Sequence, residues 1–277
     1  MDEPLRVFFK KRLNRIALPF VFWVVAYFAW RVFVYGETLT ANSIVQGVLT
    51  GPYTQFWFLY LLVGLYLITP VLRIVVRYSE RRLLRYLLVI WFVGTALIPL
   101  ITLFEPYNLN ANVFIITGWL GYYVLGAFLI KVRLKRSTLT MLFALSMAWT
   151  IIGTYLVVGT IGERLNEFFH DSTSFNIIIA SAAFFLLLAT IPSQTVESRL
   201  PRGSVVLRQI SQNTLPTYLF HLMVLETLQK GFLGFKISLT TMNPIVEIPL
   251  ITAVTLLICL AVIIPLKKIP YVKRLIG

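Results

Sequence analysis

The feature that most constrains the fold is a series of long apolar stretches that recurs along the chain. A helix needs about 20 apolar residues to cross the roughly 30 Å hydrocarbon core of a bilayer. Eight stretches approach that length, at residues 16–35, 55–73, 86–104, 113–130, 137–159, 173–192, 209–230 and 247–266. They do not alternate apolar and polar residues as the strands of a membrane β-barrel do. We therefore expect an all-α, polytopic helical membrane protein with about eight transmembrane helices.

The composition of the 277 residues agrees with this expectation. Apolar residues make up 58% and charged residues 13% of the chain, against about 45–50% and 25% in soluble domains. A soluble domain could not bury that much apolar surface, and the same numbers exclude a disordered chain, a disulfide-stapled secreted domain and a nucleic-acid binder. The single cysteine, Cys259, can form no internal disulfide. Because there is no internal repeat or long linker, we expect one transmembrane domain over residues 1–277.

Basic residues alternate between the two sides of the predicted helices. Of the 25 lysines and arginines, 21 fall on one side, in residues 6–15, 73–85, 131–136, 199–208 and 267–274. By the positive-inside rule we expect both termini in the cytoplasm of a multi-pass plasma-membrane protein. The net charge of +14 then matches anionic lipid headgroups and an anionic cytoplasmic ligand, and it does not require nucleic acid.

Polar side chains gather in the seventh stretch, which contains S-Q-N-T-L-P-T-Y-L-F-H-L-M-V-L-E. Thr217, Tyr218 and His221 share one helical face because they are three or four residues apart. If the helix runs unbroken from Arg208, His221 lies about 20 Å along it, past the middle of the bilayer. A neutral imidazole there can act as a general base, or it can simply hydrogen-bond between helices.

Two further polar segments flank the spans. In the basic run F-F-K-K-R-L-N-R-I-A-L-P, Arg12 and Arg15 lie on one helical face, and guanidinium pairs bind phosphate oxygens bidentately. The alternative is that these arginines only follow the positive-inside rule and bind no ligand. The loop segment 162–174 reads G-E-R-L-N-E-F-F-H-D-S-T-S. Because it has one histidine where metal ligands usually come in pairs, we expect an interfacial helix there and no metal site.

Four segments together carry a resemblance to a known family. They are F-F-K-K-R-L-N-R-I-A-L-P-F-V-F-W (8–23), F-W-F-L-Y-L-L-V-G-L-Y-L-I-T-P-V-L (56–72), G-Y-Y-V-L-G-A-F-L (121–129) and T-L-P-T-Y-L-F-H-L-M-V-L (214–225). Their order and spacing resemble those of the integral-membrane acyltransferase family 3. Members of that family move acyl groups, often acetyl or succinyl, onto sugars of surface polysaccharides, lipopolysaccharide or lipid carriers. The chain departs from the pattern at Leu222, where the family usually has proline.

The resemblance implies an acyl-CoA donor that docks from the cytoplasm and a sugar or lipid-linked glycan acceptor on the other side. Acyl-CoA is then a substrate, and no resident cofactor is implied. By resemblance, Arg12 and Arg15 hold the CoA phosphates, and Trp57 and Glu226 bind the acceptor. His221, with Tyr218 beside it, takes a catalytic role in which it supports the acceptor side or orients a partner. For Trp57 and Glu226, a position at the membrane interface is the alternative.

The basic run normally follows two earlier helices in this family, and the first of these carries an arginine and the histidine that serves as the base. Those positions would precede Met1, so we expect this chain to be inactive alone. The alternatives are that the true start lies further upstream, that the gene is truncated, or that a partner chain supplies the pair. Two other hypotheses stay open. One is an exporter or flippase for a polysaccharide or lipid-linked sugar, because Pro216 in a polar span suits a substrate path. The other is a remnant without chemistry.

Overall fold

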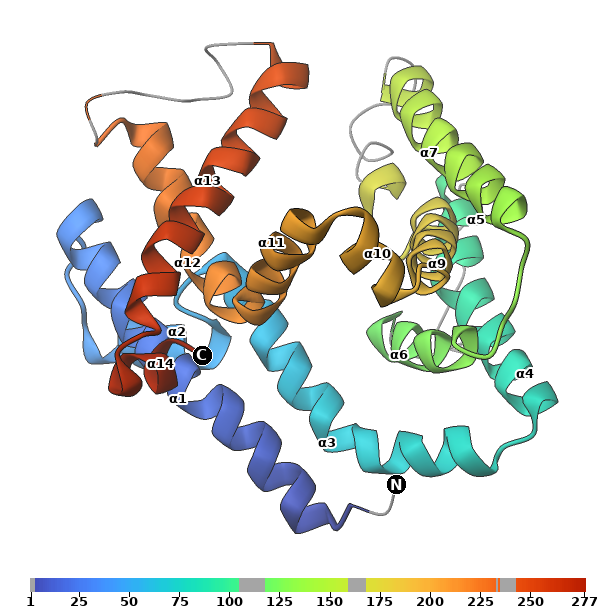
Figure 1. Ribbon diagram of the computed structural model, residues 1–277, viewed down its shortest axis with the longest axis horizontal. Coiled ribbons are helices and arrows are strands. Elements are labelled where there is room, and N and C mark those ends of the chain that lie inside the picture. The colour runs from blue at the N-terminus through green and yellow to red at the C-terminus, as the bar shows by residue number, and fades with distance from the viewer. Residues whose placement is uncertain (1–2, 105–117, 159–167, 233, 235–242) are drawn as a thin grey trace. The chain divides into compact units, whose positions relative to one another are not determined.

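The computed structural model describes residues 3–104, 118–158, 168–232, 234 and 243–277, and all regular elements in these ranges are helices (Figure 1). Within them, six helices are long and apolar enough to cross a membrane: Leu5–Tyr35, Thr54–Tyr78, Arg81–Ile101, Arg136–Leu156, Phe168–Ala189 and Pro244–Leu266. The prediction of an all-helical membrane protein is confirmed. The remaining two predicted stretches appear as the shorter helices Gly118–Leu129 and Thr214–Lys230, so the count of eight and the orientation of the termini stay predictions.

The helices group into two compact units, unit 1 (Met1–Ile68 with Leu200–Gly277) and unit 2 (Thr69–Arg199). Unit 1 contains α1 (Leu5–Tyr35), α2 (Ala41–Thr50), η1 (Thr54–Phe56), the first half of α3 (Trp57–Tyr78), α11 (Pro201–Gln212), α12 (Thr214–Lys230), α13 (Pro244–Leu266) and α14 (Pro270–Ile276). Unit 2 contains the rest of α3, α4 (Arg81–Phe92), η2 (Val93–Leu97), α5 (Ile98–Phe104), α6 (Gly118–Leu129), α7 (Arg136–Val158), α9 (Phe175–Ala189) and α10 (Ser193–Arg199). The single domain over residues 1–277 stays a prediction.

An aromatic and aliphatic core holds unit 1 together. Tyr27 of α1, Phe56 of η1 and Leu219 of α12 are completely buried. α12 lies along α13, and α14 turns back onto α1 (Figure 1). The indole Nε1 of Trp23 donates a hydrogen bond of 3.3 Å to the carbonyl of Ile276. The last helix is therefore anchored to the first, and unit 1 is closed by both ends of the chain.

Unit 2 is packed around Trp91, which is 1% exposed. Its indole Nε1 donates to the carbonyl of Gly118 at 3.1 Å. The ring lies against the backbone of α6 at Gly121, where a Cβ atom would come within 2.1 Å of it. α7 packs along α9, with the rings of Phe143 and Phe184 stacked at 5.5 Å. Small residues at helix contacts are typical of membrane proteins, because close backbone approach replaces the hydrophobic effect as the source of packing energy.

The seventh predicted stretch, 209–230, is not one helix. α11 ends at Gln212, and Asn213, with φ −115° and ψ 13°, separates it from α12. Pro216 provides the physical reason, because proline has no N–H to bond the carbonyl of Gln212 four residues earlier. The predicted stretch 209–230 is therefore divided between two helices, and the depth of His221 in the bilayer stays a prediction.

Candidate functional site

Three hydrogen bonds join α1, η1 and α12 inside the core of unit 1. The Tyr27 hydroxyl donates to the carbonyl of Leu219 at 2.7 Å, and the Gln55 side-chain amide donates to the same oxygen at 3.3 Å. The Tyr218 hydroxyl donates to the backbone carbonyl of Gln55 at 2.9 Å. Gln55 is only 4% exposed, so its amide would be poorly accommodated without these partners. The bonds fix the rotation of α12 about its axis, and with it the direction of the next polar side chain, His221.

One ring nitrogen of His221 is already occupied. Nδ1 lies 2.6 Å from the backbone carbonyl oxygen of Tyr218. A carbonyl oxygen only accepts, so Nδ1 carries the proton and donates it, and the neutral ring keeps a lone pair on Nε2. Within the described part of the chain, no hydrogen bond reaches Nε2. The backbone of α12 therefore selects the tautomer in which His221 can accept a proton from outside its own helix.

Two buried polar atoms on the same elements have no hydrogen-bond partner among the described residues, namely Gln55 Oε1 and Thr217 Oγ1. Thr217 precedes His221 by four residues and so shares its helical face. Buried polar atoms are rarely left unpaired in native structures. These two atoms are therefore suited to bind a water molecule or a hydroxyl group of a ligand.

A second polar cluster surrounds Glu226 near the end of α12. Its Oε2 accepts a hydrogen bond from Trp30 Nε1 at 2.9 Å, and its Oε1 accepts one from the Tyr53 hydroxyl. The Tyr35 hydroxyl lies 3.3 Å from that of Tyr53, and the Lys230 ammonium lies 3.4 Å from the centroid of the Tyr35 ring. Burial, and then the neighbouring Glu226, raise the pKa of Tyr53, so its hydroxyl keeps its proton. A carboxylate accepts about four hydrogen bonds, so Glu226 keeps capacity for a ligand.

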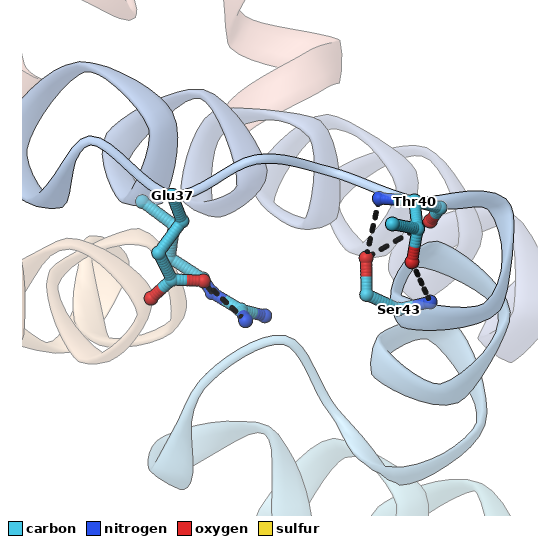
Figure 2. A network of polar contacts seen from close by, with 4 residues as sticks. Glu37, Thr40 and Ser43 are labelled. Carbon is cyan, nitrogen blue, oxygen red and sulfur yellow. Dashed lines mark hydrogen bonds and ion pairs between the residues drawn. The ribbon is translucent and has the colours of Figure 1, made fainter.

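The segment between α1 and α2, beside this cluster, is held by local polar contacts. Arg31 pairs with the Glu37 carboxylate at 2.6 Å. Figure 2 shows the adjacent capping box, in which Ser43 N donates to Thr40 Oγ1 at 3.1 Å and Thr40 N donates to Ser43 Oγ at 2.9 Å. These contacts satisfy N–H groups that the first turn of α2 would otherwise leave open. These contacts therefore hold the backbone that follows Trp30, from the end of α1 to the start of α2, in one conformation.

Trp57, predicted to contact the acceptor, begins α3 and is 46% exposed. Its ring meets Phe58 edge to face at a centroid distance of 6.0 Å, and Phe58 meets Tyr218 at 5.3 Å. The indole is thus connected to the polar region through one aromatic neighbour. Its partly exposed surface remains large enough to contact a sugar ring.

The two arginines predicted to bind phosphate have different surroundings. The Arg12 guanidinium pairs with Glu3 at 3.1 Å and lies 4.3 Å from the centroid of the Phe8 ring. Arg15 forms no ion pair with any described residue, and its positive charge acts on Lys267 just after α13. Arg15 is therefore open to an anion as the structure stands, whereas an anion at Arg12 would have to replace Glu3.

The loop segment 162–174 is only partly described. Glu163 and Glu167, considered there as part of an interfacial helix, lie outside the described residues, while His170 lies in unit 2. Across the described ranges, no group of three or more His, Cys, Asp or Glu side chains is placed to hold a metal ion.

Trp30, Tyr53 and Gln55 were not among the site residues predicted from the sequence. Tryptophan and tyrosine at the end of a span are ordinarily explained by the membrane interface, so neither stands out. The segment G-P-Y-T-Q-F (51–56) did contain a signal, because it places two hydrogen-bonding side chains between a glycine-proline turn and an apolar helix. Gly51 has φ 100°, a conformation that favours glycine, and the turn it permits directs Tyr53 and Gln55 toward α12.

These observations define a polytopic helical membrane protein with a hydrogen-bonding site inside one helical unit. The sequence matches the family model Acyl_transf_3, described as an acyltransferase domain, over residues 2–264. The chain therefore belongs to acyltransferase family 3, and the predicted family is confirmed. No curated protein and no solved structure matches the chain significantly.

Proposed function

We propose that this protein transfers an acyl group, acetyl or succinyl, from acyl-CoA to a hydroxyl of a cell-surface or lipid-linked sugar at the plasma membrane. Membership of acyltransferase family 3 supports acyl transfer. The observation that carries the proposal is His221, whose Nδ1 is held by the Tyr218 carbonyl and whose Nε2 is available. A fixed tautomer with an available nitrogen is what a general base requires. We therefore give His221 the role that the resemblance assigns to a histidine before Met1.

In the proposed reaction, the C–S bond of the thioester is replaced by a C–O bond to the sugar. Nε2 of His221 takes the proton of the sugar hydroxyl as the hydroxyl oxygen bonds to the carbonyl carbon. The C–S bond then breaks, CoA leaves as a thiolate, and the imidazolium returns the proton to the sulfur. The products are a sugar ester and free CoA, with His221 unchanged. A positioned base of this kind typically contributes roughly 10²–10⁴-fold to the rate.

Tyr218 acts as a positioning residue in this reaction. Its carbonyl fixes Nδ1 of His221, while its hydroxyl is bonded to Gln55. The two aromatic rings lie 5.6 Å apart, so the tyrosine also forms one wall beside the imidazole. Its contribution is to hold the base in a productive orientation before the acceptor arrives.

Donor and acceptor are assigned to opposite ends of α1. Arg12 and Trp30 lie 18 residues apart on this helix, which is about 27 Å at 1.5 Å per residue and close to the thickness of the hydrocarbon core. The arginine end, with Arg12 and Arg15, takes the CoA phosphates because guanidinium groups match phosphate oxygens. The Trp30 end takes the sugar, whose hydroxyls can donate to Glu226.

The test compares His221→Asn with His170→Asn in membranes from the producing cells, where every natural component is present. Asparagine keeps a side-chain N–H for the Tyr218 carbonyl but has no group at the place of Nε2. With labelled acetyl-CoA or succinyl-CoA, we expect His221→Asn to lower transfer to glycan by roughly 10²–10⁴-fold. His170→Asn, in unit 2, should leave it unchanged.

Two results would contradict the proposal. Transfer at the wild-type rate by His221→Asn would remove the histidine from the reaction. Movement of a sugar across the membrane that depends on this protein and needs no acyl-CoA would favour the exporter or flippase instead.

A further inference from the structure

A second polar region of unit 1 lies where α11, α13 and α14 meet. It is a cavity of about 460 Å³, within the range of roughly 300–1,000 Å³ that small-molecule sites occupy. Its polar lining consists of Lys267, Lys268 and Lys273 together with Gln209, Gln212 and Asn213. This cavity is here called the basic pocket.

The backbone holds Lys267 in place at the wall of the basic pocket. Its Nζ donates a hydrogen bond of 3.0 Å to the carbonyl of Gln212. That carbonyl lacks a helical donor because the residue four positions later is Pro216. A surface lysine normally samples many rotamers, whereas this one is fixed by the break between α11 and α12.

Three lysines line the basic pocket, and a fourth positive charge, that of Arg15 in α1, acts on one of them. Burial, followed by the charges of Lys273 and Arg15, lowers the pKa of Lys267. No described carboxylate forms an ion pair with these three residues or with Lys268. The carbonyl ends of α11 and α13 each supply only about half a negative charge. Four cations therefore retain an excess of about three positive charges, which a bound anion would relieve.

The positive-inside rule alone does not account for this arrangement. Topology requires lysines on one side of the membrane, but it does not require them to converge or to line a cavity. It also does not explain the amides of Gln209 and Gln212, whose side chains make no hydrogen bond to the described residues. Ammonium and amide N–H groups around one cavity form a donor set suited to a polyvalent oxyanion.

We propose that the basic pocket binds a phosphate monoester. Such a group is close to a dianion at neutral pH and has three acceptor oxygens, which matches several lysines and amides better than a singly charged diester would. Two molecules could present this group. One is CoA, through its 3′-phosphate, and this assignment rests on the proposed function. The other is phosphatidic acid in the membrane.

The experiment measures binding of CoA and of dephospho-CoA, which lacks the 3′-phosphate, to the protein in nanodiscs of neutral phosphatidylcholine. We expect the wild-type protein to bind CoA about tenfold more tightly than dephospho-CoA. Lys267→Gln and Lys273→Gln should remove that preference while leaving the affinity for dephospho-CoA unchanged, which also shows that the variants are folded. Lys131→Gln, in unit 2, is the matched control and should keep the preference.

A second measurement adds phosphatidic acid to the nanodiscs and compares its retention by wild-type protein and by Lys267→Gln. Equal binding of CoA and dephospho-CoA, with retention of phosphatidic acid that depends on Lys267, identifies the lipid as the source and keeps the phosphate site. If the wild-type protein binds neither form of CoA, the acyl-CoA donor under the proposed function is wrong. The dependence of phosphatidic acid retention on Lys267 then tests by itself whether the basic pocket binds a phosphate monoester. If neither ligand depends on Lys267 or Lys273, the basic pocket is not a phosphate site.

Discussion

Unit 1 and unit 2 are both helical and strongly apolar, yet they bury different chemistry. The interior of unit 1 contains a connected set of hydrogen bonds that runs from Tyr27 through Gln55 to the segment bearing His221. Its cavity of about 460 Å³ is lined largely by lysines and amides. The cavity of about 250 Å³ in unit 2 is instead lined by apolar side chains from α4, α6, α7 and α9, with Trp91 among them. The chemistry proposed for this protein therefore belongs to unit 1.

The buried asparagine of unit 2, Asn176, illustrates how the polar groups of the two units differ. Both N–H groups of Asn176 are used, one by Thr150 Oγ1 at 2.8 Å and one by the carbonyl of Phe169 at 3.0 Å. His221 in unit 1 uses one nitrogen and keeps the other available. Polar groups at membrane depth are retained either to join helices or to act on a substrate. The Asn176 amide joins α9 to Thr150 of α7 and to Phe169, which indicates the first role; its Oδ1 has no partner among the described residues, but an amide oxygen is not a base at neutral pH. The imidazole of His221 can take up a proton, which suits the second role.

The largest expected effect distinguishes the role of His221 from that of Asn176. His221→Asn should lower acyl transfer by roughly 10²–10⁴-fold with little change in the free energy of unfolding. Asn176→Leu leaves the buried Phe169 carbonyl without its partner, which costs about 1–3 kcal/mol, and should leave the rate per folded molecule unchanged. Transfer assays and unfolding in dodecyl sulfate, done on both variants, check this division. Loss of activity in folded Asn176→Leu would show that this polar group of unit 2 also contributes to acyl transfer.

The next effect concerns packing in unit 2. Gly121→Ala places a Cβ atom 2.1 Å from the buried Trp91 ring, so α4 and α6 must separate, at a cost of about 1–3 kcal/mol. Gly126→Ala is the matched control, because it lies on the same helix with no atom within 4 Å of its new Cβ. Unfolding curves of the two variants should differ by that amount. Equal stability would show that Trp91 moves aside freely.

A smaller effect is expected at Glu226 in unit 1. Glu226→Gln keeps the size of the side chain but loses the charge that would strengthen a hydrogen bond from an acceptor hydroxyl, in addition to those from Trp30 and Tyr53. A charge-assisted hydrogen bond exceeds a neutral one by about 1 kcal/mol, which corresponds to about a fivefold rise in the KM for the acceptor. Glu37→Gln, beside the same cluster, should raise it far less. An unchanged KM in Glu226→Gln would exclude the carboxylate from acceptor binding.

The smallest effect is a shift of a pH profile in the basic pocket. Since burial and the charges of Lys273 and Arg15 lower the pKa of Lys267, its ammonium loses its proton at a lower pH than that of an exposed lysine. CoA binding should therefore be strongest above the second phosphate pKa of about 6 and decline as pH rises through the lowered pKa of Lys267. In Arg15→Gln, which removes one of the charges that lower the pKa of Lys267 while keeping the three lysines of the pocket, the decline should move to higher pH. A decline at the same pH in both proteins would show that Lys267 does not control it.

The sequence predicted the spanning helices well where length and hydropathy alone decide. Residues 16–35, 55–73 and 247–266 fall within the helical spans Leu5–Tyr35, Thr54–Tyr78 and Pro244–Leu266. It failed at residues 209–230, because the apolar run continues past Asn213 while the backbone does not. Hydropathy measures the preference of side chains for lipid and does not register a missing N–H at Pro216.

The candidate site was predicted in part, for a related reason. His221, Tyr218 and Glu226 stand out because they are polar residues in an apolar run, and their roles stay predictions. Trp30 and Tyr53 approach Glu226 only through tertiary packing, since they lie more than 170 residues away in sequence. The lysines of the basic pocket satisfied the topology rule, and their convergence depends on the turn between α13 and α14.

Unit 1 is discontinuous, and this sets the order in which the protein can assemble. The hydrogen bond between Trp23 and Ile276 joins residues 253 positions apart, with all of unit 2 made between them. Because a chain is synthesised from its N-terminus, the helices of unit 2 are complete before α11 to α14 exist. Until then the buried faces of Trp23 and Tyr27 lack their partners in α12 and α14. The contacts that complete unit 1 therefore form only after every residue of unit 2 has been synthesised.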